Sequence, residues 1–273
     1  MGILNITEDS FFDGGIYFNN TDKYLSRIET MLEEGADMID IGCMATNPKA
    51  KELSEYEELK ITESTLKCIL SRFPDVIFSI DTWRSTVAEM AIEMGVSIIN
   101  DISGGEFDEK MFAVLARLQV PYILMHTSDK PEFMQQKTDY QDVVSEVFLY
   151  ISKRLEKLRL LGVNDVIVDP GFGFGKTISQ NYNLLAELHL FKALGCPVLA
   201  GLSRKSMLYN FLETTPQQAL NATTVANTIA ILHGASILRV HDVKETKEAI
   251  KIVSQVFDCA QINFTCFLMR TTQ

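Results

Sequence analysis

The sequence has little of several features that would place it in a specialised class of proteins. Its five cysteines are scattered, odd in number and never arranged as a CxxC pair, which favours neither a disulfide framework nor a zinc site. The formal net charge of −11 disfavours a general binder of nucleic acid or anionic membranes, because either surface would repel the protein at long range. No apolar run approaches the roughly 20 residues that span a bilayer, and residues 1–5 lack the basic start of a secretory signal. We therefore expect reduced thiols and a cytoplasmic location.

The composition is that of an ordinary globular protein. Of the 273 residues, 47% are apolar and 22% are charged, which is enough apolar material for a large core. No linker rich in Pro, Gly or Ser divides the chain. We expect a single domain over residues 1–257, followed by a C-terminal tail over residues 258–273.

Short apolar segments alternate with helical patterns along the chain. The expected strands are residues 2–6, 38–41, 76–80, 97–99, 122–125, 166–168, 198–202 and 237–240. The expected helices, with apolar residues three to four apart, are residues 22–34, 54–72, 85–94, 108–118, 141–161, 181–194, 216–233 and 244–257. Parallel strands joined by helices require right-handed crossovers, and regular alternation closes most simply as an α/β (β/α)8 TIM barrel. A doubly wound open sheet is the alternative fold.

Polar residues stand at or just past the ends of the expected strands. They are Asp40, Asp81, Asn100, Asp101, His126, Asp169, Arg239, His241 and Asp242. A strand that is apolar throughout is buried on both faces, and the strand ends of a closed barrel converge. One such residue alone could be a helix cap. Together they predict a site at one rim of the barrel.

The segment after the first expected strand, residues 5–15, combines carboxylates and hydroxyls with Phe11, Phe12 and a terminal Gly pair. Adjacent phenylalanines are costly to expose. The composition therefore favours a lid that closes over a ligand and is hinged at the glycines. The alternative interpretation, a solvated turn, is less favoured.

Residues 169–176 carry three alternate glycines and end at Lys176. Glycines let the backbone approach a ligand closely, and Lys176 could meet an anion. The end of the segment copies a Walker A loop, but Pro170 stands where that loop requires glycine, and GxGxxG does not fit either. We interpret the segment as functional, because a structural turn would need fewer glycines.

The side chains at the rim suit a flat heterocycle. Asp81, Asn100 and Asp169 can accept hydrogen bonds from its N–H groups, and two such bonds offset the desolvation of a buried carboxylate. Lys205, which follows the seventh expected strand, would donate to the acceptors of the ring.

The last expected strand favours an anion site. Arg239 and His241 are two residues apart and point to the same side, whereas Asp242 faces the other way. The planar fork of Arg suits phosphate oxygens. His126 could equally be a core residue or a ligand, and we interpret His189 and His233, which lie within helical patterns, as structural.

In this order the motifs resemble those of the dihydropteroate synthase family over nearly the whole chain. The segments that carry the resemblance are residues 1–15, 79–82, 98–101, 124–126, 169–176, 203–206 and 239–242. The resemblance implies a pterin-binding TIM barrel and a transferase of folate biosynthesis. The reaction would join 6-hydroxymethyl-7,8-dihydropterin diphosphate to 4-aminobenzoate and release pyrophosphate and 7,8-dihydropteroate. It also implies Mg²⁺ and a homodimer formed through outer helices.

The resemblance further implies a role for each matching residue. Asp81, Asn100, Asp169 and Lys205 would hold the pterin, and Asn5, Arg239 and His241 the diphosphate, with Asn5 also touching Mg²⁺. Phe11, Thr46, Pro48, Phe174 and Ser206 would form the aminobenzoate side. Catalysis would be electrostatic, through Arg239, His241 and Lys205, and without a covalent nucleophile on the protein.

The chain departs from the family pattern mainly in the segment after the second expected strand. The family usually has arginine where this chain has Asn47, and Lys49 could replace the charge but not the planar fork. Glu8 stands where the family usually has proline, and Asp129 where it often has glycine. These changes motivate the hypothesis that recognition of aminobenzoate, and of the sulfonamides that mimic it, is altered while pterin binding is kept. Titration with a sulfonamide in the presence of pyrophosphate and a pterin tests it, and ordinary inhibition would remove the idea.

Two other functions compete with this interpretation. A diverged, non-catalytic pterin-binding paralogue is compatible with the altered segment around Asn47. The pterin-binding domain of corrinoid-dependent methyltransferases is a second relative, but residues 203–205 and the pair of Arg239 and His241 resemble the synthases, and no cobalamin-binding partner domain is present. Detection of dihydropteroate separates the synthase from both.

We expect Asn47→Arg to raise turnover at low aminobenzoate concentration. The substitution supplies the planar cation that could contact pyrophosphate or brace a closed loop. Steady-state rates of the two proteins over a series of aminobenzoate concentrations measure the effect. Equal rates would mean that Lys49 already compensates.

Overall fold

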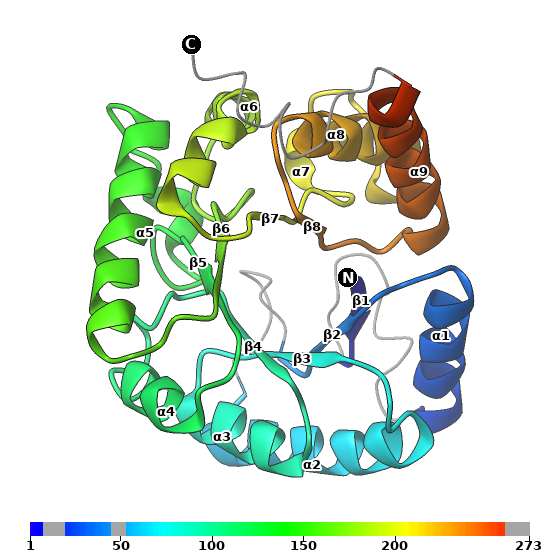
Figure 1. Ribbon diagram of the computed structural model, residues 1–273, viewed down its shortest axis with the longest axis vertical. Coiled ribbons are helices and arrows are strands. Elements are labelled where there is room, and N and C mark those ends of the chain that lie inside the picture. Colours follow the sequence, from blue (N-terminus) through cyan, green and yellow to red (C-terminus); the bar gives the residue numbers. More distant parts are fainter. Residues whose placement is uncertain (8–19, 45–52, 260–273) are drawn as a thin grey trace.

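The structure is a computed structural model that describes residues 1–7, 20–44 and 53–259. Its strands are β1 (Gly2–Asn5), β2 (Ile39–Gly42), β3 (Phe78–Asp81), β4 (Ile98–Asp101), β5 (Tyr122–Met125), β6 (Val166–Asp169), β7 (Leu199–Ala200) and β8 (Ile237–Leu238). All neighbouring strands pair in parallel, β1 to β6 in chain order and β7 with β8. Two bridges join these sheets, from Val168 to Val198 and from Gly2 to Val240. The strands therefore close into the predicted TIM barrel, and the open-sheet alternative is wrong (Figure 1).

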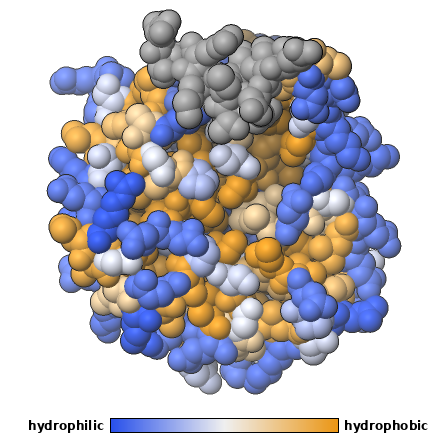
Figure 2. Space-filling view, in the orientation of Figure 1, coloured by the Kyte–Doolittle hydropathy of each residue, from blue (hydrophilic) through white to orange (hydrophobic). Residues whose placement is uncertain are grey.

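Helices surround the barrel as an outer ring (Figure 1). They are α1 (Thr21–Glu33), α2 (Glu55–Arg72), α3 (Ser85–Met94), α4 (Met111–Leu118), α5 (Val143–Leu160), α6 (Ile178–Ala186), α7 (Ser206–Tyr209), α8 (Leu220–Leu232) and α9 (Val243–Cys259). Short 3₁₀ turns are η1 (Met134–Gln136), η2 (Leu188–Leu194) and η3 (Pro216–Gln218). Much of the middle of the face in the space-filling view is hydrophobic, and hydrophilic residues dominate its periphery (Figure 2).

Three helical segments differ from the sequence prediction. The helix expected over residues 216–233 is divided into η3 and α8. The helix expected over residues 181–194 is divided into α6 and η2, and α6 begins earlier, because Thr177 caps it and Gln180 closes a capping box with it. Helix α7 was not predicted, since its four residues are too few to show a helical period.

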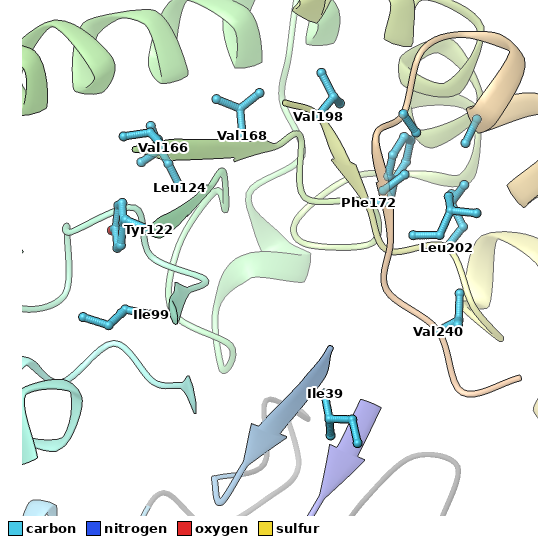
Figure 3. Packing of buried hydrophobic residues seen from close by; sticks show 14 of the residues in the cluster. Ile39, Ile99, Tyr122, Leu124, Val166, Val168, Phe172, Val198, Leu202 and Val240 are labelled. Carbon is cyan, nitrogen blue, oxygen red and sulfur yellow. The ribbon is translucent and has the colours of Figure 1, made fainter. Parts of the chain in front are cut away.

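The strands present two different apolar layers. Ile41, Ile80, Ile99, Leu124 and Val168 belong to the large core between the sheet and the helices, part of which is shown in Figure 3. The residues that alternate with them form a separate cluster inside the barrel, made of Met1, Ile98, Ile123, Ile167 and Leu199 with Met38 and Ile237 packed on it. This cluster, called the apolar plug below, fills the part of the barrel interior that lies beneath the C-terminal rim.

The register of the strands then fixes what lies above this plug. Asn5 pairs with Gly42, Gly42 with Asp81, and Asp81 with Asn100. Met125 pairs with Asp169 two strands further on. Since residues in register share one face of the sheet, these polar side chains point into the barrel at its C-terminal rim.

Three other expectations concern the chain as a whole. The four described cysteines are free, as expected. Among the described residues, no helix has both the length and the apolar character needed to cross a membrane. Helix α9 continues to Cys259, and residues 260–273 of the expected tail lie outside the described residues.

Candidate active site

The rim brings together most of the predicted site residues. Asn5, Asp81, Asn100 and Asp169 lie at the ends of β1, β3, β4 and β6, and Lys205, Arg239 and His241 follow β7 and β8. Ser206 begins α7 and is exposed, and Phe174 is half-buried. Phe11, Thr46 and Pro48, like Glu8, Asn47 and Lys49, lie outside the described residues.

Arg239 is the centre of a partly buried ion-pair network. Its Nε donates to Asp40 Oδ2 over 2.6 Å, and its Nη2 donates to Asp81 Oδ2 over 2.7 Å. The amide of Asn100 donates to the same oxygen of Asp40 over 2.9 Å. The network therefore ties together side chains from β2, β3, β4 and the segment after β8. Sequence analysis had singled out Asp40 at a strand end without giving it a role.

Gly42 makes room for two of the predicted site residues. A Cβ atom at this position would lie 3.3 Å from Asn5 Oδ1 and 3.7 Å from Asp81 Cβ. Glycine thus lets these neighbours in register approach each other across β2. No local pattern in the sequence indicates this role, because it depends on which residues are paired across the strands.

Lys205 lies between the acids and the glycine-rich segment. Its Nζ contacts the carbonyl oxygen of Phe172 and lies 4.7 Å from the centroid of the Phe174 ring. Asp169 Oδ1 accepts a hydrogen bond from Gly171 N over 2.7 Å. The predicted pterin-side pair of Asp169 and Lys205 is therefore built on the backbone of residues 171–174.

The glycine-rich segment packs tightly against the end of β5. Gly171 has a φ of +72°, and a Cβ atom there would lie 1.9 Å from the carbonyl oxygen of His126. Only glycine combines this backbone conformation with so close an approach. The sequence predicts that these glycines let the backbone approach a ligand, whereas the close neighbour of Gly171 is the carbonyl oxygen of His126.

Lys176 holds this segment from inside. The residue is only 4% exposed, and its Nζ lies 2.8 Å from Gly171 O, 3.0 Å from Phe174 O and 2.9 Å from His126 Nδ1. Burial lowers the pKa of both Lys176 and His126. Lys176 therefore does not meet an anion as the sequence suggested, and His126 is a buried core residue.

An apolar wall stands beside the polar network. Met44, Trp83, Ile102 and Met125 form a buried cluster, and Phe107 and Phe174 pack on it. The rings of Trp83 and Phe107 meet edge to face with centroids 5.7 Å apart. Sequence analysis missed this wall, although Trp83 follows the Asp81 motif directly. Together with the acids, it offers a flat ring both apolar contact and hydrogen-bond partners.

Burial moves the ionisable groups of the rim toward neutrality. It raises the pKa of Asp81 to about 7, against the opposing pull of Arg239, and it also raises the pKa of Asp169. It lowers the pKa of Lys205 to about 8, although Asp169 opposes this. Burial would likewise lower the pKa of Arg239, but Asp40 and Asp81 raise it above its ordinary value. Arg239 is therefore the permanent charge of the rim.

His241 is neutral near physiological pH. Burial, followed by the charges of Arg239 and Arg204, lowers its pKa to about 3. Its backbone carbonyl accepts a hydrogen bond from Arg27 Nη2 over 2.6 Å. The side chain can therefore contribute hydrogen bonding to an anion, but not charge.

An ion pair between Arg204 and Asp242 joins the segment that carries Lys205 to the segment that carries His241. Arg204 donates from Nε and Nη2 to the two oxygens of Asp242, over 2.9 and 2.7 Å. A bidentate pair of this kind has a fixed geometry and holds the two loops together.

The contacts of the remaining histidines and of Asp129, one of the departures from the family pattern, do not include the rim network. His233 Nδ1 contacts Leu185 O over 3.0 Å, and its ring meets that of His189 edge to face, so both are structural as expected. Asp129 accepts a hydrogen bond from Lys130 N over 2.7 Å and pairs with Lys137.

Comparison with known proteins gives a consistent result. Residues 1–241 match the family described as pterin binding enzyme. The chain is 40% identical over 254 residues to the dihydropteroate synthase of Haemophilus influenzae, covering 92% of this chain and 91% of that protein. It is 40% identical over 260 residues to the dihydropteroate synthase of a Synechocystis species, covering 94% and 89%.

Solved structures agree with these relatives. The dihydropteroate synthase of Yersinia pestis in a complex with a sulfonamide drug superposes with a TM-score of 0.89, at 38% identity and with 94% and 93% of the two chains covered. The Xanthomonas albilineans dihydropteroate synthase with 4-aminobenzoic acid has a TM-score of 0.85, at 34% identity and with 93% and 91% covered.

We expect Lys176→Met to lower the free energy of unfolding by about 1–3 kcal/mol, because it leaves buried carbonyl oxygens of the glycine-rich segment without their donor. Denaturant unfolding measures the loss. Lys153→Met on the exposed side of α5 is the matched control, and we expect it to change stability by less than about 0.5 kcal/mol. Equal stabilities of the two variants would contradict the role given to Lys176.

Proposed function

Because the chain belongs to the pterin-binding enzyme family, we propose how its barrel rim carries out the chemistry of that family. The protein is a transferase that acts as a dihydropteroate synthase in folate biosynthesis. Its reaction joins 6-hydroxymethyl-7,8-dihydropterin diphosphate to 4-aminobenzoate and releases pyrophosphate and 7,8-dihydropteroate. The observation that carries the assignment of residues is the meeting of Asp81, Asn100 and Arg239 in one partly buried network.

The pterin ring binds between the acids and the apolar wall. Its N–H groups donate to Asp81 and Asp169, Asn100 supplies an amide, and Lys205 donates to the ring acceptors. Among the described residues, the only hydrogen bond to the Asp169 carboxylate is accepted by Oδ1. Its Oδ2 can therefore accept an N–H group of the pterin, which supports this role. The apolar cluster around Trp83 supports it too, since it gives the ring faces a partner.

The diphosphate binds at Arg239, His241 and Asn5. Arg239 directs Nε and Nη2 to the two acids, and Nη1 has no hydrogen-bond partner among the described residues, which supports a contact from Nη1 to a phosphate oxygen. His241 is neutral and adds a hydrogen bond, since its pKa is about 3.

Mg²⁺ fits this part of the rim as a partner of the substrate. Among the described residues no group of three or more His, Cys, Asp or Glu side chains could hold a metal ion alone. The side-chain oxygen of Asn5, which like Asp81 is in register with Gly42, is a ligand of the kind Mg²⁺ prefers, and the diphosphate would complete the ligand set. When bound, the ion would neutralise charge on the leaving pyrophosphate.

Aminobenzoate binds on the loop side of the pterin. Phe174 and Ser206 both adjoin Lys205, which supports their place beside the reacting carbon. Phe11, Thr46 and Pro48 would complete this side, and they lie outside the described residues.

The chemistry requires position and electrostatics from the protein. The bond between the pterin CH₂ carbon and the diphosphate oxygen breaks, its electron pair leaves with pyrophosphate, and the amine nitrogen of aminobenzoate attacks the carbon. The amine then loses a proton. Arg239 stabilises the charge that develops on the leaving group, His241 donates a hydrogen bond to it, and the acids stabilise the electron-poor pterin. No bond to the protein forms.

Product formation tests the activity directly. Purified protein with pterin diphosphate, aminobenzoate and Mg²⁺ should release dihydropteroate and pyrophosphate in equal amounts. Pterin binding without product would favour the non-catalytic paralogue, a reading that the synthase relatives do not support.

The extent of the domain and the cellular location are further proposals. Val253 and Phe257 of α9 are buried in the main core, which supports a domain that extends to residue 257. A cytoplasmic location agrees with the substrates of folate biosynthesis.

We further propose a homodimer through α8 and α9. Val225, Ile229 and Leu232 form an exposed stripe on α8, and Ile252 and Val256 of the neighbouring α9 are also exposed. Val225→Glu combined with Ile252→Glu should convert a dimer to a monomer, because two charges would be buried at the interface. Sedimentation velocity measures the change. Leu160→Glu on α5, where the leucine is 82% exposed, is the matched control and should leave the dimer intact.

The pH profile of kcat/KM for pterin diphosphate should be bell-shaped. Only ionised Asp81 can accept two N–H donors, so activity rises with pH through about 7, the raised pKa of this carboxyl. Only charged Lys205 has its full set of donors, so activity falls above about 8, its lowered pKa. Asp81→Asn should remove the acidic limb and keep the alkaline one. A flat wild-type profile between pH 6 and 9 would contradict both assignments.

A further inference from the structure

We propose that Asp40 is a positioning residue that sets Arg239 and Asn100 for the reaction. The inference rests on the proposed roles of these two residues in binding the diphosphate and the pterin. Asp40 touches neither substrate in this proposal, because it lies one layer below the rim.

The register places Asp40 too deep to reach a ligand itself. It pairs with Ser79, whereas Asp81 pairs with Gly42 two residues further along both strands. Its side chain is 0% exposed, while that of Asp81 is 12% exposed. Asp40 therefore occupies the layer between the apolar plug and the rim.

All hydrogen bonds of the Asp40 carboxylate run to the proposed site. Oδ2 receives Arg239 Nε at 2.6 Å and Asn100 Nδ2 at 2.9 Å. Oδ1 is buried and has no hydrogen-bond partner among the described residues. One oxygen of Asp40 thus holds the side chains of Asn100 and Arg239, which are far apart in the sequence.

Stability alone does not explain a carboxylate at this depth. Its neighbour in register on β1 is the buried, apolar Ile3. Buried ion pairs seldom stabilise a fold more than apolar residues of similar volume, because desolvation offsets the attraction. The unpartnered Oδ1 adds to that cost. We therefore attribute the carboxylate at this position to the orientation of Arg239 and Asn100.

Asp40 is also the acid that can keep Arg239 in place during binding. Arg239 is shared by Asp40 and Asp81, but Asp81 is the one proposed to accept N–H groups of the pterin. As the pterin engages Asp81, that carboxylate has less capacity for Arg239. Asp40 holds Nε throughout, so the rest of the guanidinium stays directed at the diphosphate.

The test is the kinetics of Asp40→Asn, which keeps the volume and removes the charge. We expect KM for pterin diphosphate to rise by about tenfold or more, equivalent to ~1.4 kcal/mol, while KM for aminobenzoate changes less than about twofold. Asp101→Asn is the matched control, because Asp101 is equally buried but bonds to Ser103, Gly105 and Tyr122 outside the network. It should lower the melting temperature without moving either KM.

A double-mutant cycle then asks whether Asp40 acts through Arg239. Once Arg239→Lys has removed the Nε contact, adding Asp40→Asn should cost much less than it does alone. If Asp40→Asn does not fold, Asp40→Ser takes its place in the same cycle. Additive effects, or equal increases in both KM values, would overturn the proposal.

The proposed function fails in a different way. If the wild-type protein makes no dihydropteroate, the proposed function is wrong. If Arg239→Lys leaves the kinetics unchanged, the proposed site is wrong. Normal kinetics of Asp40→Asn, in a background where Arg239→Lys is impaired, would remove the role of Asp40 alone.

Discussion

The capture of Arg239 between Asp40 and Asp81 is the interaction on which the candidate site depends. The two acids lie 199 and 158 residues away from Arg239 in the sequence. They can meet it only because the barrel closes, which places the segment after β8 beside β1 and, through β1, beside β2. An open sheet would leave Arg239 at one edge and the acids elsewhere. Closure of the barrel and assembly of the site are thus one event.

Closure also explains how the fold tolerates so many buried charges. Each of several strands contributes an apolar residue to the plug and, two positions later, a residue to the rim: Ile98 and Asn100, Ile123 and Met125, Ile167 and Asp169. The plug supplies hydrophobic stabilisation that the rim lacks. At the rim, burial raises the pKa of Asp81 and lowers that of Lys205, so burial disfavours the charged forms of these two groups. The same strands therefore carry stability and reactivity in separate layers.

The sequence was sufficient for the parts that local patterns encode. Apolar segments located every strand, and polar strand ends located Asp81, Asn100, Asp169 and Arg239. It could not give Asp40 its role, because depth in the barrel depends on register, and strand β2 runs past Asp40 to Gly42. Lys176 was predicted to be an anion ligand, because the direction of its side chain also depends on the three-dimensional fold. Nothing in its local sequence shows that it turns inward onto Gly171 and His126.

The two sides of the site also differ in how freely their sequence can change. The proposed pterin side is made of paired strand ends, where side chains are closely spaced: a Cβ atom at residue 42 would lie 3.3 Å from Asn5 Oδ1 and 3.7 Å from Asp81 Cβ. The departures Glu8 and Asn47 instead fall in the segments that follow β1 and β2, on the proposed aminobenzoate side. Because the network of Asp40, Asp81, Asn100 and Arg239 closes without those segments, a substitution there leaves the register untouched. On the proposed residue roles, we therefore expect differences between this enzyme and its relatives in substrate recognition to concentrate on the arylamine.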